Sequence, residues 1–178
     1  MNFEEIKAGS KIIRLTEETE IKPFDCGDND LNDFLSNDAK NYLSSLFAVT
    51  YLIQQETETI AYFTLSNDSV TRYDVDKSEW NKLNRNVAND KRKKRYPAVK
   101  LGRLAVSKKL AQMGFGKLIL YYIRETYANE LQPAGCRFIT VDAYTGVTDF
   151  YARNGFKFMT QEDTDKNTRA MYFDLKSI

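Results

Sequence analysis

The segment from residue 98 to residue 127 constrains most strongly how this chain can fold. It begins with the alternating run AVKLGRLAV (98–106), passes through a loop that contains Gly114 and Gly116, and continues with apolar residues at helical spacing from Phe115 onward. Alternation is typical of a strand, and steps of three and four residues are typical of a helix. We therefore predict a strand, a glycine turn and a helix in direct succession, within a mixed α/β fold.

The glycine turn is expected to bind phosphate, because free N–H groups and the positive end of the helix dipole converge at a helix N-terminus. A Walker loop is excluded, since aligning its GK with Gly116–Lys117 puts Ala111 at the first required glycine and Leu118 at the required Ser or Thr. A dinucleotide fingerprint that starts at Gly114 is also excluded, since Ile119 occupies its third glycine position.

The whole chain, residues 1–178, is expected to form a single domain that opens with a strand, a helix and two more strands. Strands are expected at 11–16, 48–55, 59–66, 98–106, 136–143 and 169–175, and helices at 27–46, 77–87, 115–127 and 147–156. Residues 67–97 have the least regular pattern. Pro97 is expected to mark a break before the next strand, because proline donates no backbone hydrogen bond, and Gly155 is expected to end the last helix.

Histidine is absent from the sequence, and its absence excludes several kinds of active site. Ser-His-Asp and Cys-His catalysis, a histidine general base and histidine-ligated zinc are ruled out, so acid–base chemistry must use Tyr, Asp, Glu, Lys, Cys or water. Cys26 and Cys136 are isolated and are expected to be reduced packing residues. No metal is expected. The sequence has neither an apolar leader nor eighteen consecutive apolar residues, so we expect a cytoplasmic protein.

Three motifs resemble the GNAT family of N-acetyltransferases. The G-x-G loop starts eight residues after Val106, DFYARNGF (149–156) resembles the family's F-Y-x-x-x-G-F signature, and VDAYT (141–145) resembles its V-x-A-x-N strand end. Their order and spacing extend the resemblance over nearly the whole chain. The resemblance implies a GNAT fold, with a central, mostly antiparallel twisted sheet that is splayed at the acyl-CoA site and flanked by helices. It also implies transfer of an acetyl group from acetyl-CoA to a primary amine.

The resemblance places the acyl-CoA site on the end of the 98–106 strand and on the glycine loop. The backbone of Leu104 and Val106 is expected to hydrogen-bond the pantetheine arm, and the loop amides are expected to hold the pyrophosphate. The implied cofactor-binding residues are Leu104, Ala105, Val106, Gln112, Met113, Gly114, Phe115, Gly116 and Lys117. The chain departs from the family pattern at Ala111, where the family has Gln or Arg, and at Thr145, where Asn is more usual.

Tyr151 matches the tyrosine of the family signature, which implies that it acts on the sulfur of the leaving CoA. Proton transfer from an ordinary tyrosine to a thiolate, with pKa values of about 10 and about 8.5, is uphill by roughly 2 kcal/mol. The hydroxyl is therefore expected to stabilise the thiolate by hydrogen bonding, or to need a lowered pKa. For the base, two alternatives stay open: a carboxylate such as Asp68 or Asp142 acting through water, or an amine that arrives neutral.

A narrower resemblance concerns the acceptor. PFDCGDNDLNDFLSNDA (23–39), YFTLS (62–66) and YPAVKLGRLAV (96–106) resemble a bacterial GNAT branch that includes toxins which acetylate the amino group of aminoacyl-tRNA. The branch also contains members of unknown substrate, so the resemblance leaves the acceptor open. The alternatives for the whole chain are a toxin-like acetyltransferase of aminoacyl-tRNA and a non-catalytic module that binds acyl-CoA.

The basic segment KRKKR (91–95), with Lys82 and Arg85 nearby, is the one feature suited to binding a polyanion in a chain whose formal net charge is +1. Three interpretations remain open: a solvated loop, a contact to tRNA phosphates beside the acceptor site, and a contact to the 3′-phosphate of CoA. Members of the family often form dimers, so the resemblance also leaves a homodimer open. No membrane partner is expected.

Overall fold

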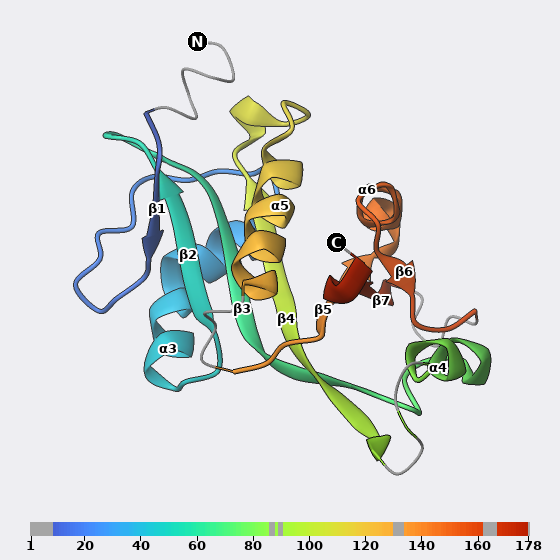
Figure 1. Cartoon of the computed structure of the whole chain (residues 1–178). Coiled ribbons are helices and arrows are strands. Elements are labelled where there is room, and N and C mark those ends of the chain that lie inside the picture. The colour runs from blue at the N-terminus through green and yellow to red at the C-terminus, as the bar shows by residue number, and fades with distance from the viewer. Residues whose placement is uncertain (1–8, 86–87, 89–90, 130–133, 162–166, 178) are drawn as a thin grey trace. The chain divides into compact units, whose positions relative to one another are not determined.

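The computed structural model describes residues 9–85, 88, 91–129, 134–161 and 167–177. In this part of the chain seven strands join in one sheet, in the order β1-β2-β3-β4-β5-β7-β6 (Figure 1). The strands are β1 (Lys11–Arg14), β2 (Val49–Gln54), β3 (Thr59–Thr71), β4 (Arg95–Val106), β5 (Phe138–Tyr144), β6 (Lys157–Phe158) and β7 (Thr168–Asp174).

The helices are α2 (Asn29–Asp33), the π-helical segment η1 (Phe34–Asp38), α3 (Ala39–Ser44), α4 (Lys77–Leu83), α5 (Phe115–Ala128) and α6 (Thr148–Arg153). Short 3₁₀ turns lie at η3 (Lys108–Leu110), η4 (Thr145–Val147) and η5 (Leu175–Ser177). Among the described helices, none combines the length and the hydropathy that crossing a bilayer requires.

Strand pairing is mostly antiparallel, as the resemblance to the GNAT family implied. β1 with β2, β2 with β3, β5 with β7 and β6 with β7 are antiparallel pairs. β4 and β5 are parallel, and their register joins Ala98–Lys100 to Phe138–Thr140. A parallel pair needs a crossover, which here contains the glycine loop and α5.

The chain divides into two compact units. Residues 1–66 and 101–120 contribute to the first unit, and residues 67–100 and 121–178 contribute to the second. The boundaries fall inside β3, between Lys100 and Leu101 of β4, and inside α5, so each of these elements supplies residues to both units. The prediction of a single domain over residues 1–178 stays a prediction, and each unit is described by itself below.

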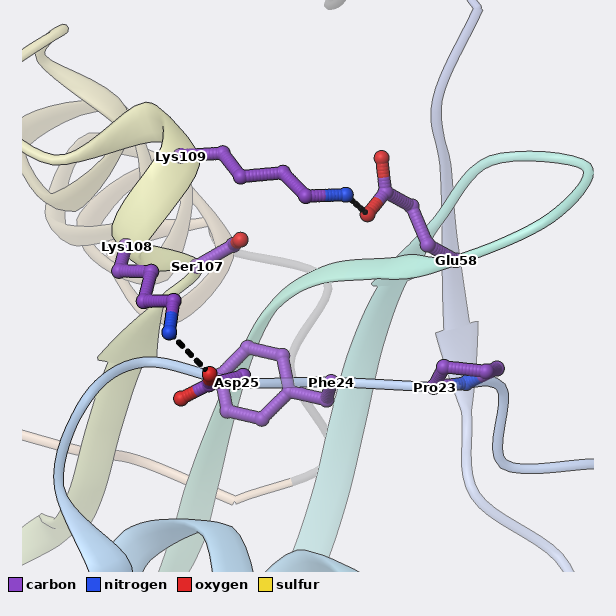
Figure 2. Close-up of a pocket in the computed structure, with 7 residues that line it drawn as sticks. All are labelled: Pro23, Phe24, Asp25, Glu58, Ser107, Lys108 and Lys109. Carbon is purple, nitrogen blue, oxygen red and sulfur yellow. Dashed lines mark hydrogen bonds and ion pairs between the residues drawn. The ribbon is translucent and has the colours of Figure 1, made fainter.

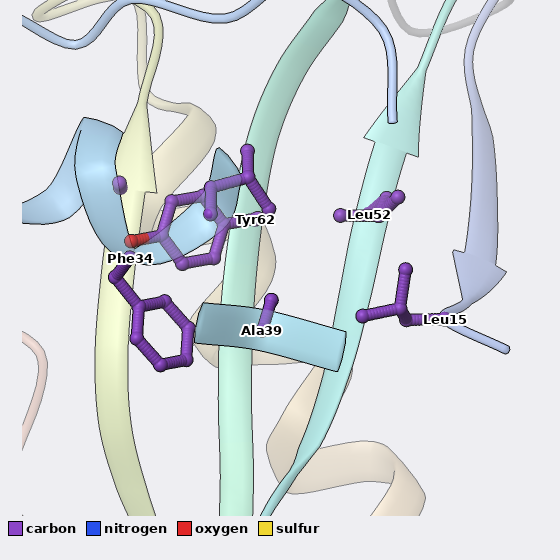
Figure 3. Close-up of a cluster of buried hydrophobic side chains, with 7 residues drawn as sticks. Leu15, Phe34, Ala39, Leu52 and Tyr62 are labelled. Carbon is purple, nitrogen blue, oxygen red and sulfur yellow. The ribbon is translucent and has the colours of Figure 1, made fainter. Parts of the chain in front are cut away.

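The core of the first unit lies between the helical segment α2–η1–α3 and the strands of the sheet (Figure 3). Its buried residues are Leu15, Phe34, Leu35, Ala39, Leu52, Tyr62 and Ala105. The segment becomes helical where Asp28 caps it, accepting a hydrogen bond from the Leu31 N–H (3.1 Å). The buried Tyr62 hydroxyl donates to the Leu31 carbonyl (2.8 Å), which satisfies a polar group that burial would otherwise make costly.

The core of the second unit holds α4 against the sheet. The buried residues of this core are Val70, Val75, Ala98, Phe138, Met159 and Tyr172. The Tyr172 hydroxyl donates to the Glu79 carboxylate (2.7 Å), and the Tyr96 hydroxyl donates to the Asn84 side chain (2.5 Å). The helix predicted over 77–87 is confirmed over Lys77–Leu83, which form α4. Residues 86 and 87 lie outside the described residues.

Two local expectations for residues 67–97 are wrong. β3 continues to Thr71, five residues past the expected strand end at 66, and Pro97 lies inside β4 rather than at a break. The Pro97 carbonyl accepts a hydrogen bond from the Arg137 N–H (2.9 Å). A proline disrupts a strand where its missing N–H would have to pair with a neighbouring strand. The described register of β4 with β5 begins at Ala98, so Pro97 precedes the first paired residue and its missing N–H removes no bond from that ladder.

Candidate functional site

The end of β4 is anchored to neighbouring segments of the first unit. Ala105 is 4% exposed and packs in the core, whereas Leu104 and Val106 on either side of it are half-buried. Just beyond the strand, the Ser107 N–H donates to the Ile60 carbonyl of β3 (2.8 Å). The described register of β4 with β5 stops at Lys100, so these last residues of β4 are not part of that ladder.

Two ion pairs hold the η3 turn that follows β4. Lys108 lies 2.6 Å from the Asp25 carboxylate, and Lys109 lies 2.6 Å from the Glu58 carboxylate. The Lys108 N–H also donates to the Asp25 carbonyl (3.0 Å). Figure 2 shows both lysine side chains pointing toward their partners across a small pocket of about 190 Å³, which Pro23, Phe24 and Ser107 also line.

The charge on Asp25 is stabilised by several donors. Hydrogen bonds from Lys108, from the Gly27 N–H and from the Asn32 amide lower the pKa of the Asp25 carboxyl to about 2. The same contact with Asp25 raises the pKa of Lys108. Sequence reasoning missed this arrangement, because Asp25 and Glu58 are far from the lysines along the chain. The two ion pairs position the η3 turn, which leads directly into the glycine loop.

The glycine loop contains two residues in the left-handed region. Gly114 has a φ of +87°, and a Cβ placed on it would meet no atom within 4 Å, so the space beside it is open. Gln112 has a φ of +64° although it carries a side chain, which is uncommon and costs energy unless the surroundings or a ligand require it. Ala111, Gln112, Met113 and Gly114 are all exposed. The loop therefore presents its backbone to solvent.

Helix α5 starts directly after this loop, as predicted. Phe115 is 2% exposed and anchors the first turn in the core, and the Leu118 N–H makes the first helical hydrogen bond, to the Gly114 carbonyl (3.1 Å). The N–H groups of the first turn precede this bond and have no partner within the helix. Gly116 is half-buried and Lys117 is exposed. The predicted loop residues thus come together at one helix N-terminus, a geometry that binds anions.

Tyr151 belongs to the second unit and is almost completely buried. The side chain is 7% exposed and lies in edge contacts with the rings of Phe150 (5.1 Å) and Phe156 (5.4 Å). Burial raises the pKa of Tyr151 to about 12. Burial alone causes this shift, with no contribution from a hydrogen bond to the hydroxyl within the described residues, so that donor is available to a ligand.

The turn after α6 fixes the position of Tyr151. The Tyr151 carbonyl accepts from the Phe156 N–H (3.1 Å), and the Gly155 N–H donates to the Ala152 carbonyl (2.9 Å), the pattern of a Schellman motif. Gly155 has the expected positive φ of +83°, so the helix end predicted there is confirmed. Arg124 of α5 donates a hydrogen bond to the Asn154 carbonyl in the same turn, a contact that the sequence did not reveal.

The two carboxylates considered as bases are both engaged. Asp68 accepts from the Thr140 hydroxyl and from the Ser69 N–H (2.7 Å), and Asp142 pairs with Lys100 (2.5 Å). Within the described ranges, no group of three or more Cys, Asp or Glu side chains could hold a metal ion. Neither carboxylate is left free to accept a proton without giving up an interaction.

The basic segment is exposed, and the two cationic residues near it, Lys82 and Arg85, have different surroundings. Residues 91–95 all lie at the surface at the start of β4. Lys82 pairs with Glu79 (3.1 Å), whose carboxylate also accepts from Tyr172, whereas Arg85 is exposed just after α4. Thr145, the other departure from the family pattern, starts the η4 turn, and its N–H donates to the Asn167 carbonyl (3.0 Å).

Comparisons with known proteins decide the fold. No family model matches the chain, and no curated protein sequence matches it. A bacterial toxin of known structure is 18% identical over 94% of this chain and 92% of its own, with a TM-score of 0.77. AtaT complexed with acetyl-methionyl-tRNAfMet is 23% identical over 94% of this chain and 96% of its own, also with a TM-score of 0.77. A Tyr→Phe mutant of KacT is 23% identical over 95% and 96%, with a TM-score of 0.76.

The chain has the GNAT fold. The expected mixed α/β architecture, with a mostly antiparallel sheet flanked by helices, is thereby confirmed. Within the GNAT fold, the glycine loop, the start of α5 and the α6 turn occupy the order along the chain that the motifs predicted. At these levels of identity the likeness concerns the fold, and the roles of the individual residues are taken up below.

Proposed function

We propose that this chain is an N-acetyltransferase that transfers an acetyl group from acetyl-CoA to a primary amine. The observation that carries the proposal is the open space beside Gly114, at an exposed loop that leads into the N-terminus of α5. A side chain would fill that space, and a pyrophosphate fits the positive end of the helix dipole. A solved AtaTR structure with bound AcCoA, 23% identical and with a TM-score of 0.72, supports the choice of cofactor.

The residues of the first unit would hold acetyl-CoA by backbone contacts. The N–H groups from Gly114 to Lys117 would bind the pyrophosphate, and the exposed Lys117 ammonium would add positive charge. Ala111 cannot make the side-chain contact that Gln or Arg would make. The amide of Gln112, exposed and in the left-handed region, is our candidate for that contact, with Met113 and Phe115 shaping the loop around it. Backbone groups of Leu104, Ala105 and Val106 would receive the pantetheine arm.

Tyr151 would stabilise the leaving thiolate as a hydrogen-bond donor. When bound, acetyl-CoA supplies the activated acyl group. With the pKa of Tyr151 at about 12, complete proton transfer to a thiolate whose pKa is about 8.5 is uphill by about 5 kcal/mol. The hydroxyl therefore keeps its proton and offers it to developing negative charge, as donors in an oxyanion hole do.

The acceptor amine would have to lose its proton before it attacks. Asp68 and Asp142 could serve through water only by weakening the contacts that they make to Thr140 and Lys100. We therefore favour an amine that arrives neutral and releases its second proton to solvent. An α-amino group, with an ordinary pKa of about 8, meets this requirement much better than a lysine side chain at about 10.4.

The first test is acetyl-CoA binding by calorimetry with Gly116→Asp and Gly116→Asn, two variants of nearly equal size. Glycine is a poor helix former, and an acidic residue in the first turn favours the helix dipole, so neither variant is expected to unfold the protein. The negative charge of Gly116→Asp should weaken acetyl-CoA binding at least tenfold more than Gly116→Asn does. A wild-type protein that does not bind acetyl-CoA would show the proposed function to be wrong.

The acceptor that we propose is the α-amino group of an aminoacyl-tRNA. The exposed basic segment 91–95 favours a polyanionic acceptor, and the AtaT structure with acetyl-methionyl-tRNAfMet supports this choice. A screen with charged tRNA and with free amino acids and polyamines, using radiolabelled acetyl-CoA, tests it. Labelling of charged tRNA alone is the expected result, whereas labelling of small amines alone would identify a small-molecule enzyme.

The last part of the proposal concerns a small partner protein. AtaT is known bound to the C-terminus of the antitoxin AtaR, in a structure 22% identical to this chain with a TM-score of 0.73. We propose an antitoxin-like partner for this chain, and copurification with the product of an adjacent small reading frame tests it. A homodimer, suggested by the family, stays a prediction that sedimentation can test. The alternative of a non-catalytic acyl-CoA-binding module predicts acetyl-CoA binding without turnover.

A further inference from the structure

The turn that follows β3 presents an aromatic ring to solvent. Tyr73 is 78% exposed, although it lies in the sequence between two core residues of the second unit, Val70 and Val75. Large aromatic rings usually bury most of their area or use their hydroxyl group as a polar handle. The Tyr73 hydroxyl has no described hydrogen-bond partner, so neither use accounts for this residue.

Three hydrogen bonds order the backbone of this turn. The Thr71 N–H donates to the Asp74 carboxylate (2.6 Å), the Asp74 N–H donates to the Thr71 carbonyl (3.2 Å), and the Tyr73 N–H donates to the Thr71 hydroxyl (3.2 Å). The acidic side chain in the turn is therefore occupied by a backbone donor. A ring on an ordered turn loses little conformational entropy when it binds a partner, which favours a contact at this point.

One cationic side chain contacts the ring, and the basic segment lies beside the turn. The Arg72 guanidinium lies 5.1 Å from the centre of the Tyr73 ring, within the range of a cation–π contact. The Arg72 N–H donates to the Lys94 carbonyl (3.2 Å), which brings the end of β3 against the basic segment. Lys93, Lys94 and Arg95 are all exposed there. We call Arg72, Tyr73 and residues 93–95 the Tyr73 surface; it combines one exposed ring with four positive charges.

We propose that the Tyr73 surface binds RNA that contains an unpaired nucleotide, whose base stacks on the Tyr73 ring while the cations contact the adjacent phosphates. Aromatic rings beside a basic groove are the usual means of binding single-stranded nucleic acid, and stacking requires a base that is not paired. An acidic protein segment would satisfy the charges but has no planar group that requires an exposed ring. The inference rests on the proposed tRNA acceptor and adds a site at which that RNA is held.

The experiment measures binding of a fluorescein-labelled single-stranded RNA 12-mer, and of a blunt RNA duplex of the same length, by anisotropy at several salt concentrations. Tyr73→Ala should weaken binding of the single strand about tenfold and leave binding of the duplex unchanged, whereas Tyr73→Phe should bind both as the wild type does. The double variant Lys93→Gln, Lys94→Gln should weaken both and flatten the dependence on salt. The matched charge control, Lys11→Gln with Lys176→Gln, should change neither.

The outcomes separate this inference from the proposed function when acetyl-CoA binding is measured on the same proteins. If Tyr73→Ala binds single-stranded RNA as the wild type does, or if the surface captures a poly-glutamate peptide more tightly than RNA, the inference is wrong and the acetyltransferase proposal is untouched. If RNA binding depends on Tyr73 but the wild type binds no acetyl-CoA, the Tyr73 surface is confirmed as an RNA-binding site and the acetyltransferase proposal is wrong.

Discussion

At the scale of single residues, two helix ends share one backbone conformation, which suits the residue at one end and strains the residue at the other. α6 and α3 both end in a Schellman motif, in which the residue after the cap adopts a positive φ. In α6 this residue is Gly155, which tolerates that conformation, and in α3 it is Leu46, with a φ of 58° and a side chain 90% exposed. The leucine thus carries backbone strain without the benefit of burial.

Leu46→Gly should therefore stabilise the protein. A left-handed conformation costs an ordinary residue roughly 1–2 kcal/mol, and the greater freedom of glycine in the unfolded chain returns part of this gain. We expect the free energy of unfolding to rise by about 0.5–1 kcal/mol in urea denaturation. Leu46→Ala serves as the control, because it keeps the strain and should give no gain; destabilisation by Leu46→Gly would contradict the explanation.

Tyr151→Phe tests the catalytic role that we assign to the hydroxyl. Because burial alone, without a hydrogen bond from a described residue, shifts the pKa of that group, its removal should leave the free energy of unfolding unchanged or slightly higher. Loss of a donor to the thiolate should lower kcat by about 10²-fold and leave the KM for acetyl-CoA nearly unchanged. Unchanged turnover with every accepted amine would remove Tyr151 from the mechanism.

The raised pKa of Tyr151 also predicts a dependence of stability on pH. An unfolded tyrosine has a pKa of about 10 and burial raises that of Tyr151 to about 12, so the folded state holds this proton more tightly. The stabilisation is complete below about pH 10 and is lost as the pH rises toward 12. Wild type should therefore lose up to about 3 kcal/mol more than Tyr151→Phe over this interval, measured by urea denaturation at each pH. Parallel curves for the two proteins would contradict the shift.

At the scale of elements, Arg124 connects α5 to the turn that positions Tyr151. Its guanidinium donates to the Asn154 carbonyl and lies 4.0 Å from the centre of the Phe173 ring. Burial lowers the pKa of Arg124, and its Nε has no hydrogen-bond partner among the described residues. The flat guanidinium is held between an aromatic ring and a backbone carbonyl, a geometry that lysine cannot reproduce.

Arg124→Ala should destabilise the protein by about 2 kcal/mol, because it removes a cation–π contact and a hydrogen bond of about 1 kcal/mol each. Urea denaturation measures this loss. Arg153→Ala is the matched control and should cost less than about 0.5 kcal/mol, because among the described residues its guanidinium bonds only to Asp149 of its own helix. Equal effects of the two substitutions would show that Arg124 has no special role at this junction.

At the scale of the whole molecule, the two compact units cannot be separated by cutting a single linker. β3, β4 and α5 each run through a unit boundary, so unfolding one unit pulls on strands and a helix of the other. We therefore expect one cooperative thermal transition, with a calorimetric enthalpy equal to the van't Hoff enthalpy. Two resolved transitions, or a protease-resistant fragment that corresponds to one unit, would contradict this expectation.

The sequence alone was sufficient to predict the order of most elements, the glycine loop at the start of α5 and the end of α6 at Gly155. These features depend on local physics: the period of apolar residues, the free N–H groups of a helix end, and the positive φ that glycine tolerates. The residues predicted to bind acetyl-CoA and the role of Tyr151 rest on motifs, and they stay predictions.

Only the tertiary structure decided the features that depend on residues distant in sequence. Pro97 is tolerated in a strand because the described ladder of β4 with β5 begins one residue later, and Lys108 is fixed because the Asp25 carboxylate reaches it. Tyr151 is a very weak acid because rings from its surroundings exclude water. The basic segment lies beside the turn that carries Tyr73 because the Arg72 N–H bonds to the Lys94 carbonyl. Local sequence patterns do not predict such contacts, because burial, ion pairing and desolvation arise only when separate segments pack together.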